Sequence, residues 1–235
     1  MAMLTKDPER ESRAAGRSCG ECSLCCTILR VDELAKRAGD DCVHQRRPDP
    51  GGAAAAGAAA DGTAEAVAGA AEAAAGAGVL GGCGIYETRP SICRGYRCLW
   101  LQGGLEDDER PDRTGGIVDL ETTGVGLRLA IREARRGAFD ASPALQTIAE
   151  RYREQMPVRI SNAEDVMNPD RPFRVLLAES VEHRVEGDRI EIRREGRLVE
   201  RRRLPWAERW ARRLANGWRA RRLARWPARD ADSGR

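Results

Sequence analysis

The chain has 235 residues and a formal net charge of +3, with 41% hydrophobic residues but only 4% aromatic ones. This length allows one domain of ordinary size with appendages, or two small domains. A charge so close to neutral does not by itself indicate a nucleic-acid or membrane partner. Large core-forming side chains are scarce, so a metal–thiolate site would supply stability that such a core lacks.

The N-terminal residues 1–17 are charged and polar, and we expect a disordered leader there. They have neither the apolar stretch nor the cleavage site of a signal peptide. No run in the sequence approaches the roughly 18 apolar residues needed to cross a bilayer. We therefore expect a cytoplasmic protein, and clustered cysteines in that reducing compartment favour metal binding over disulfides.

Half of the eight cysteines lie within eight consecutive residues, with the spacing C-x2-C-x2-C-C. A C-x2-C step lets one tight turn present two sulfurs to one ion, and four thiolates at about 2.3 Å complete a zinc site. A long helix would spread the first four sulfurs over about 10 Å, too far for one ion. The segment is therefore a compact loop, or its thiolates serve a site larger than one metal. The full set is Cys19, Cys22, Cys25, Cys26, Cys42, Cys83, Cys93 and Cys98.

Eight thiolates divide into two tetrathiolate sites, or into one cluster and one zinc ion. The C-x2-C-x2-C spacing also begins iron–sulfur ferredoxins, although their C-x3-C-P ending is missing here. Spacing therefore leaves zinc and an iron–sulfur centre both open. Arg89, Arg94 and Arg97 flank the last two cysteines and would offset part of the thiolate charge. His44 is a further candidate ligand that we expect at the surface, and we expect His183 to be structural.

The segments between the cysteines carry their own signals. Apolar spacing predicts a helix over 28–38. Residues 51–82 are almost all alanine and glycine, and we predict a flexible insertion because they bury too little apolar area to become ordered. Pro90 fits the first turn of a short helix that leads through Cys93 to Cys98 and ends by Gly103-Gly104. Residues expected to pack around the site are Tyr86, Ile92, Trp100 and Leu101.

Residues 105–204 change to short strands and a helix, which predicts an α+β region. Alternating residues on either side of Thr123-Gly124 predict a hairpin of 117–121 and 125–131. Ser142-Pro143 is a helix-capping pair and opens a predicted helix to about residue 155. This half contains no catalytic motif that we recognise. Further strands are predicted at 158–160, 175–178, 190–193 and 198–202.

Residues 205–235 contain a basic helix, predicted from Trp206 to Trp226, and a tail. Trp206, Trp210, Leu214 and Trp218 share one arc of the helical wheel, and arginines lie opposite. In order of preference, we expect this helix to dock on its own domain, to bind a protein partner, or to lie on a membrane surface.

The eight-cysteine pattern resembles the YkgJ-type cysteine cluster family, also described as the zinc- or iron-chelating C-x2-C-x2-C-C domain. The resemblance covers about residues 18–101 and includes Tyr86, Arg89-Pro90 and Arg94. It implies a metal-binding domain over 18–104 in which all eight cysteines are ligands. Some relatives have carried a flagellin methylase label, but no cofactor-binding fingerprint in this chain supports a methyltransferase.

The sequence thus predicts an α+β protein. A small cysteine-cluster domain, stabilised by metal–thiolate bonds, precedes the α+β region and the C-terminal amphipathic helix. The leading functional prediction is a protein that binds zinc or iron, as single or paired ions or as an iron–sulfur centre. One alternative is an iron–sulfur-dependent redox or protein-modifying enzyme. The other is a zinc-stabilised module that binds a protein partner or nucleic acid.

Overall fold

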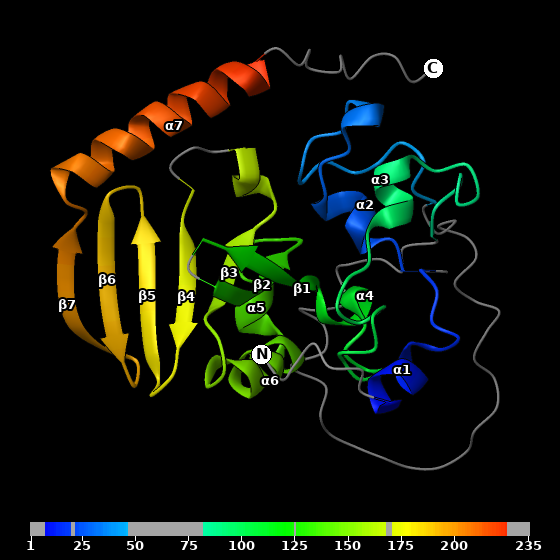
Figure 1. The fold of residues 1–235 in the computed structure, drawn as a ribbon, viewed down its shortest axis with the longest axis horizontal. Helices are drawn as coiled ribbons and strands as arrows, with labels where there is room; N and C mark the ends of the chain where they lie inside the picture. The colour runs from blue at the N-terminus through cyan, green and yellow to red at the C-terminus, as the bar shows by residue number, and fades with distance from the viewer. Residues whose placement is uncertain (1–7, 20–21, 47–81, 125, 168–170, 225–235) are drawn as a thin grey trace, which may run out of the picture.

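The computed structural model contains one seven-stranded sheet in which the strands follow chain order, with the cysteine-rich segments beside the first strand (Figure 1). The described residues are 8–19, 22–46, 82–124, 126–167 and 171–224. The strands are β1 (Gly116–Thr123), β2 (Gly126–Glu133), β3 (Val158–Asn162), β4 (Phe173–Leu177), β5 (Val181–Glu186), β6 (Arg189–Arg194) and β7 (Arg197–Arg203). The helices are α1 (Pro8–Ala14), α2 (Leu24–Ile28), η2 (Asp32–Leu34), α3 (Ser91–Gly95), α4 (Pro111–Thr114), α5 (Ala138–Ala141), α6 (Pro143–Arg153), η3 (Glu164–Met167) and α7 (Trp206–Ala224).

The predicted α+β character of residues 105–204 is confirmed, and so is the hairpin, which β1 and β2 form. The strands predicted near 158, 175, 190 and 198 are also present, whereas β5 was not predicted. Within the described residues, neighbouring strands pair antiparallel except β2 and β3, which are parallel. Parallel neighbours need a crossover connection, and α5 and α6 provide it.

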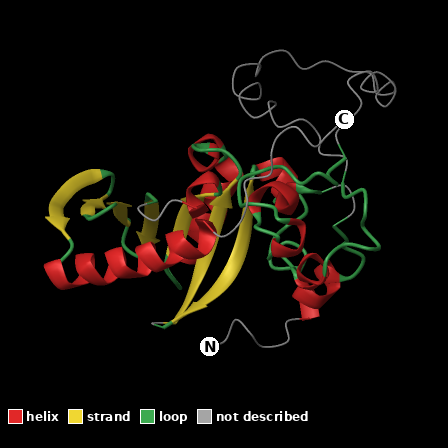
Figure 2. Ribbon diagram, turned by 90° about the horizontal axis from the view of Figure 1, so that it is seen from above, coloured by secondary structure: helices red, strands yellow, loops and turns green. Residues whose placement is uncertain are grey.

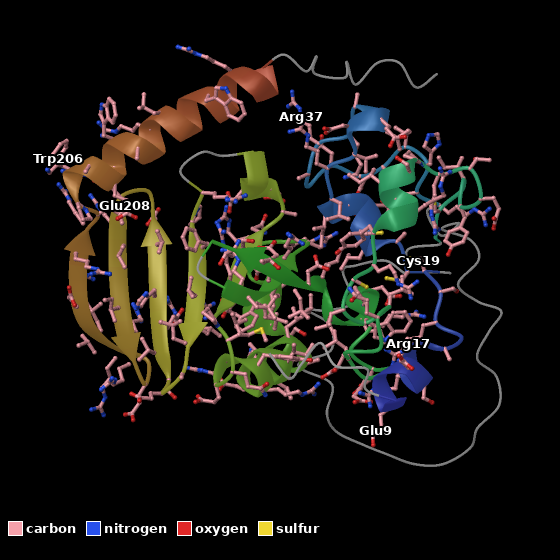
Figure 3. All side chains as sticks on the ribbon, viewed as in Figure 1. Glu9, Arg17, Cys19, Arg37, Trp206 and Glu208 are labelled. Atoms are coloured by element: carbon pink, nitrogen blue, oxygen red, sulfur yellow. The ribbon has the colours of Figure 1, made fainter. Side chains whose placement is uncertain are left out.

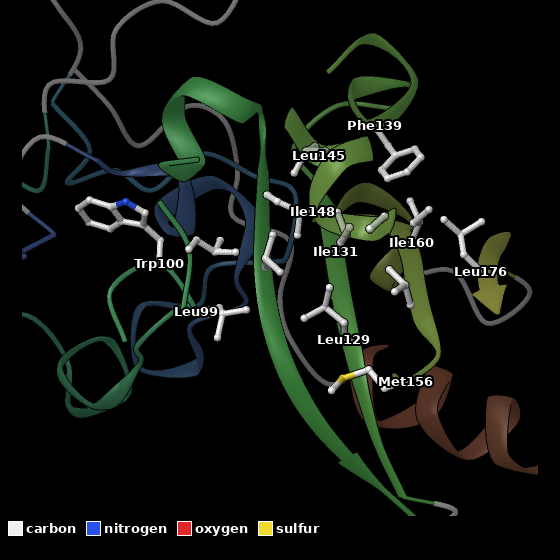
Figure 4. Close-up of a cluster of buried hydrophobic side chains, with 14 of the residues drawn as sticks. Leu99, Trp100, Leu129, Ile131, Phe139, Leu145, Ile148, Met156, Ile160 and Leu176 are labelled. Carbon is white, nitrogen blue, oxygen red and sulfur yellow. The ribbon is translucent and has the colours of Figure 1, made fainter. Parts of the chain in front are cut away.

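Helix α6 confirms the prediction made from Ser142-Pro143. The Ser142 hydroxyl accepts a hydrogen bond of 3.3 Å from the backbone N–H of Leu145, so it caps the helix at its first turn. Leu145, Ile148 and Ala149 are each 0% exposed, and they form the buried face of α6 against the sheet (Figure 4). Burial of each large side chain contributes about 1.5–3 kcal/mol.

The hydrophobic core crosses the boundary that the sequence placed at residue 104. Leu99, Trp100 and Leu101 come from the cysteine-rich half, yet they belong to the same buried cluster as Leu129 and Ile131 of β2 (Figure 4). The two halves therefore share one core rather than forming separate hydrophobic units.

Strand β1 faces both halves of the protein because successive side chains of a strand point to opposite faces. Ile117 packs in a small cluster with Leu24 and Ile28 of α2, while its neighbour Val118 joins the main core. The outer edge of β1 also makes a hydrogen bond to the cysteine-rich half, because Leu99 donates its N–H to the Val118 carbonyl at 2.8 Å. The cysteine-rich half thus covers an edge that would otherwise expose its backbone groups.

The prediction of a disordered leader over 1–17 is wrong for its second half. Residues 8–14 form α1, and Arg17 donates to the carbonyls of Trp100 at 2.7 Å and Leu105 at 2.8 Å. The same guanidinium lies over the Trp100 ring, 4.6 Å from its centroid. These contacts hold the segment just before Cys19 against the core (Figure 3). Residues 1–7 lie outside the described part, as do residues 47–81, which cover nearly all of the predicted insertion.

Helix α7 confirms the predicted C-terminal helix from Trp206 to Ala224, while residues 225–235 lie outside the described part. It extends along one side of the molecule (Figure 2). Its apolar residues are exposed: Trp206 by 76%, Trp210 by 63% and Trp218 by 66%. These three indole rings are therefore not buried in the described core, although Arg209 of α7 pairs with Asp188 at 3.5 Å. No helix in the described part combines the length and hydropathy that membrane crossing needs.

Candidate metal centre

The first cysteine group lies in a loop followed by a single helical turn. Cys22 precedes α2, and α2 carries Cys25 and Cys26. This is the compact arrangement that the spacing allowed as an alternative to a long helix. Leu24 and Ile28, the apolar residues of α2, are buried against Ile117 of β1, and this contact fixes the turn beside the sheet.

The predicted helix over 28–38 is wrong. The ammonium of Lys36, a residue only 5% exposed, donates to the carbonyls of Thr27 at 3.0 Å, Leu29 at 2.6 Å and Arg37 at 2.9 Å. In a helix each of these carbonyls would point along the helix axis and accept a hydrogen bond from the N–H four residues further on. Here they converge on one buried cation instead, so the chain folds back after α2 and only the short turn η2 forms.

Cys42 and Cys83 are brought together by a short antiparallel contact. Gln45 and Cys83 form an isolated bridge, and Gly84 donates its N–H to the His44 carbonyl at 2.7 Å. The backbone of Arg46 adds a hydrogen bond of 2.9 Å to Gly82. Segments on both sides of residues 47–81 therefore meet.

Helix α3 carries Cys93 and begins after Pro90, as predicted. It ends at Gly95, earlier than predicted, so Cys98 lies in the irregular segment that leads to the β1 edge. Leu99, the next residue, makes the hydrogen bond to Val118, which ties Cys98 to the sheet.

All eight cysteines line one or both of two adjoining cavities. The sheet-side cavity has a volume of about 20 Å³, and its cysteines are Cys19, Cys22, Cys25 and Cys98. The loop-side cavity has a volume of about 50 Å³ and is lined by every cysteine except Cys98. Cys19 and Cys98, the two extremes of the motif, are 79 positions apart and line the same sheet-side cavity.

The eight thiols are free of disulfides and half-buried. Among the described residues, no three Cys, His, Asp or Glu side chains stand in an arrangement that would hold a metal ion as they are. The thiols therefore line the cavities without forming a finished coordination shell. The donor set fits zinc or iron in kind and in number, because soft thiolates are the ligands that zinc and iron–sulfur centres take.

The thiols of the sheet-side cavity are in an apolar setting. Burial raises the pKa of Cys22 to about 12, although N–H groups of Leu24 and Asp112 donate to its sulfur. Burial likewise raises the pKa of Cys98 to about 11, against hydrogen bonds from the backbone of Leu101 and Trp100. Without a cation these sulfurs are held as thiols, while the N–H donors are already placed to stabilise thiolates.

The loop-side cavity carries positive charge. A hydrogen bond from Cys25 lowers the pKa of Cys26 to about 7, and Lys36, Cys83 and Arg89 lower it further against the effect of burial. Lys36 and Arg89 both line this cavity, and Arg89 lies over the Tyr86 ring at 3.7 Å. The surroundings of Cys26 therefore favour its thiolate form, the form that binds a cation.

The three arginines predicted to offset thiolate charge behave differently. Arg89 and Arg97 both lower the pKa of Cys19, which burial raises overall. Arg94 instead donates to the Arg89 carbonyl at 2.9 Å, which steadies the segment before α3. The cation that sequence reasoning missed is Lys36, whose position depends on three backbone carbonyls rather than on any motif.

Tyr96 lines both cavities, whereas Tyr86, which we expected to pack around the site, contacts only the lining residue Arg89 among the interactions described above. Its hydroxyl donates to the Asp119 carboxylate, with both oxygens at 2.8 Å, and Arg132 pairs with the same carboxylate. Burial beside Asp119 raises the pKa of Tyr96 well above its usual value, so it stays neutral. The position of Tyr96 between Cys93 and Cys98 was a usable signal, since residues between two ligands must lie near the site.

Of the other residues that we expected around the site, some line the cavities and others do not. Trp100 and Leu101 line the sheet-side cavity, as expected, but Ile92 is 52% exposed and lines neither cavity. His44 is not among the residues that line either cavity. His183 lies in β5, paired with Val175 and Ile192, in agreement with a structural role.

A larger cavity of about 470 Å³ lies at the carboxyl ends of β2 and β3, away from the cysteines. Glu133 and Asn162 are register partners at those ends and are 7% and 3% exposed. The side-chain oxygen Oδ1 of Asn162 accepts a hydrogen bond of 2.8 Å from the Glu164 N–H. The side-chain nitrogen Nδ2 of Asn162 has no hydrogen-bond partner among the described residues. No motif indicated this cavity, because Glu133 and Asn162 are brought together only by the parallel pairing.

Comparison with known proteins returns no match: no protein-family model, no curated protein and no solved structure is significantly similar to the chain. The resemblance to the YkgJ-type family therefore depends on the cysteine spacing and stays a prediction.

Proposed function

We propose that the chain is a metal-binding protein whose cysteine thiolates hold zinc or iron, the latter as ions or as an iron–sulfur centre. The observation that carries this proposal is that all eight free cysteines, from segments far apart in the sequence, line two adjoining cavities. Scattered structural cysteines would not converge in this way. When bound, the metal supplies crosslinks between these segments.

The local setting supports the proposal. The cysteine-rich half has short helical turns and little regular structure, so its segments need a crosslink to keep their positions. Lys36 and Arg89 place positive charge where thiolates would accumulate negative charge. A reducing cytoplasm would keep the thiols available for metal. The proposed ligands are the eight cysteines, in agreement with what the YkgJ-type resemblance implies.

Anaerobic purification followed by metal analysis, sulfide analysis and an absorption spectrum tests the proposal. We expect zinc or iron bound in proportion to the chain. Colourless protein with zinc would identify a thiolate zinc protein, whereas iron with sulfide and a broad visible absorption would identify an iron–sulfur protein. The proposal is overturned by a folded chain that carries no zinc, iron or sulfide and takes up none of them on reconstitution.

An iron–sulfur-dependent redox or protein-modifying enzyme is the first alternative. The polar cavity at the ends of β2 and β3 is of a size that takes small molecules, which favours this alternative over a purely structural role. Reversible bleaching of the visible absorption by dithionite would support it. Colourless zinc-loaded protein would exclude it.

A zinc-stabilised module that binds a protein partner or nucleic acid is the second alternative. The observation in its favour is the exposed face of α7, where Trp206, Trp210 and Leu214 are more than half exposed. Arg213 and Arg221 on the same helix are exposed as well. Salt-sensitive binding that disappears on deletion of residues 205–226 would support this role. Binding that survives the deletion would contradict it.

A further inference from the structure

The arrangement of the two cavities divides the eight cysteines into two sets. Cys98 lines only the sheet-side cavity, whereas four cysteines line only the loop-side cavity. The remaining three, Cys19, Cys22 and Cys25, line both and form the wall between them. The loop-side set is Cys26, Cys42, Cys83 and Cys93.

Cavity lining and sequence spacing assign the wall cysteines to the sheet side. Cys25 lines both cavities, whereas Cys26, its hydrogen-bonded neighbour in α2, lines the loop-side cavity alone. Cys22 and Cys25 are separated by the C-x2-C step, which presents two sulfurs to one ion. With Cys19 one further C-x2-C step before them, these three join Cys98 as a set of four.

The cavity volumes agree with this division. A water-sized occupant needs roughly 10–15 Å³, so the sheet-side cavity of about 20 Å³ has room for about one. One ion and four thiolates is the composition of a closed structural zinc site. The four cysteines exclusive to the loop-side cavity are enough for a second such site.

The two sets differ in their surroundings. The sheet-side set is packed against Trp100, Leu101 and Ile117, which are at most 7% exposed and belong to the protein core. The loop-side set is drawn from four separate segments, and Cys83 and Cys93 are less deeply buried than Cys22 and Cys98. Trp100, Leu101 and Ile117 do not line the loop-side cavity, so release of an ion from that cavity does not require these core side chains to move.

We propose that the chain holds two separate tetrathiolate centres: a slowly exchanging structural centre at Cys19, Cys22, Cys25 and Cys98, and an exchangeable centre at Cys26, Cys42, Cys83 and Cys93. This inference rests on the proposed metal-binding function. It places the adjacent residues Cys25 and Cys26 in different centres.

Zinc-loaded full-length protein and two variants test the division. We expect about two zinc ions per wild-type chain and about one in either Cys98→Ser or Cys93→Ser, measured by elemental analysis. Transfer of zinc to a chromophoric chelator should show a fast and a slow phase in the wild type. Cys98→Ser should keep only the fast phase, and Cys93→Ser only the slow one. His44→Ala, which alters no lining residue, should keep both ions and both phases.

Loss of all zinc from both variants, or a single phase in the wild type, would indicate one joint cluster and overturn the division while leaving metal binding intact. A wild type without metal overturns the proposed function itself, and the division with it. If Cys98→Ser does not fold, cadmium-113 NMR of the wild type still decides. Two resonances without cadmium–cadmium coupling support separate centres, and coupled resonances from bridging thiolates contradict them.

Discussion

The two halves of the molecule are stabilised in different ways. The sheet half satisfies its own backbone through a continuous ladder of seven strands, and its core side chains, such as Leu129, Ile131 and Leu145, are completely buried. The cysteine-rich half has one-turn helices and isolated bridges, and its contacts include the hydrogen bonds of the buried Lys36 ammonium. In the function that we propose, metal–thiolate bonds add to these contacts. Removing metal and removing core atoms should therefore damage different parts of the protein.

Metal removal is expected to have the largest effect. Structural zinc contributes on the order of 10 kcal/mol in small thiolate domains, so stripping the ions should release the cysteine-rich half. Amide hydrogen exchange should show loss of protection in α2 and α3, with protection retained in β2 and β3. Metal-loaded protein in the same buffer is the control. Equal loss of protection in both halves would show that the sheet depends on the metal too.

Leu129→Ala tests the stability of the sheet half. Leu129 is 0% exposed in β2, so its truncation should lower the free energy of unfolding by about 3 kcal/mol, through lost burial and the cavity left behind. Chemical denaturation measures this, and metal content below the transition should not change. Leu198→Ala in β7, where the side chain is 43% exposed, is the matched control with an expected change within about 0.5 kcal/mol. Similar losses in both variants would be inconsistent with a core centred on β2.

Tyr96→Phe tests the connection between the halves. It removes the hydrogen bond to Asp119 and should cost about 1.5–3 kcal/mol, the usual range for a bond to a charged group. A double-mutant cycle with Asp119→Asn separates this bond from general packing. We expect the two substitutions to be non-additive. Strict additivity would mean that the tyrosine supports the cysteine-rich half in another way.

Trp210→Ala should have the smallest effect on stability. The side chain is 63% exposed on α7, so we expect a change in unfolding free energy within about 0.5 kcal/mol. Leu204→Ala is the control just before the same helix, because Leu204 is 6% exposed and packs with Val185 and Ile190. It should cost about 2–5 kcal/mol. A large loss from Trp210→Ala would show that the exposed face of α7 is covered in solution.

Local patterns predicted much of this structure. The hairpin around Thr123-Gly124 and the helix cap at Ser142 are encoded within a few residues, and both were found. The cysteine spacing led us to expect one metal-binding place for distant segments, and cysteines from these segments line two adjoining cavities. Whether that place holds metal is still a prediction.

Features that depend on distant partners could not be predicted. Arg17 reaches carbonyls more than 80 residues away, so α1 looked like part of a polar leader. Lys36 lies within the segment 28–38 that was predicted to be helical, yet its ammonium organises three backbone carbonyls. The shared core across residue 104 was also invisible, because Leu99 gains its role only when β1 lies alongside.

The bridge between Gln45 and Cys83 has a use in protein engineering. It holds Arg46 and Gly82 side by side, and the entropic cost of closing a loop grows only as the logarithm of its length. A second folded domain with neighbouring termini can therefore be inserted between Arg46 and Gly82 with little change at Cys42. A circularly permuted fluorescent protein in that position would be joined next to a proposed ligand of the exchangeable centre. Its emission would then serve as a genetically encoded sensor of the ion in living cells.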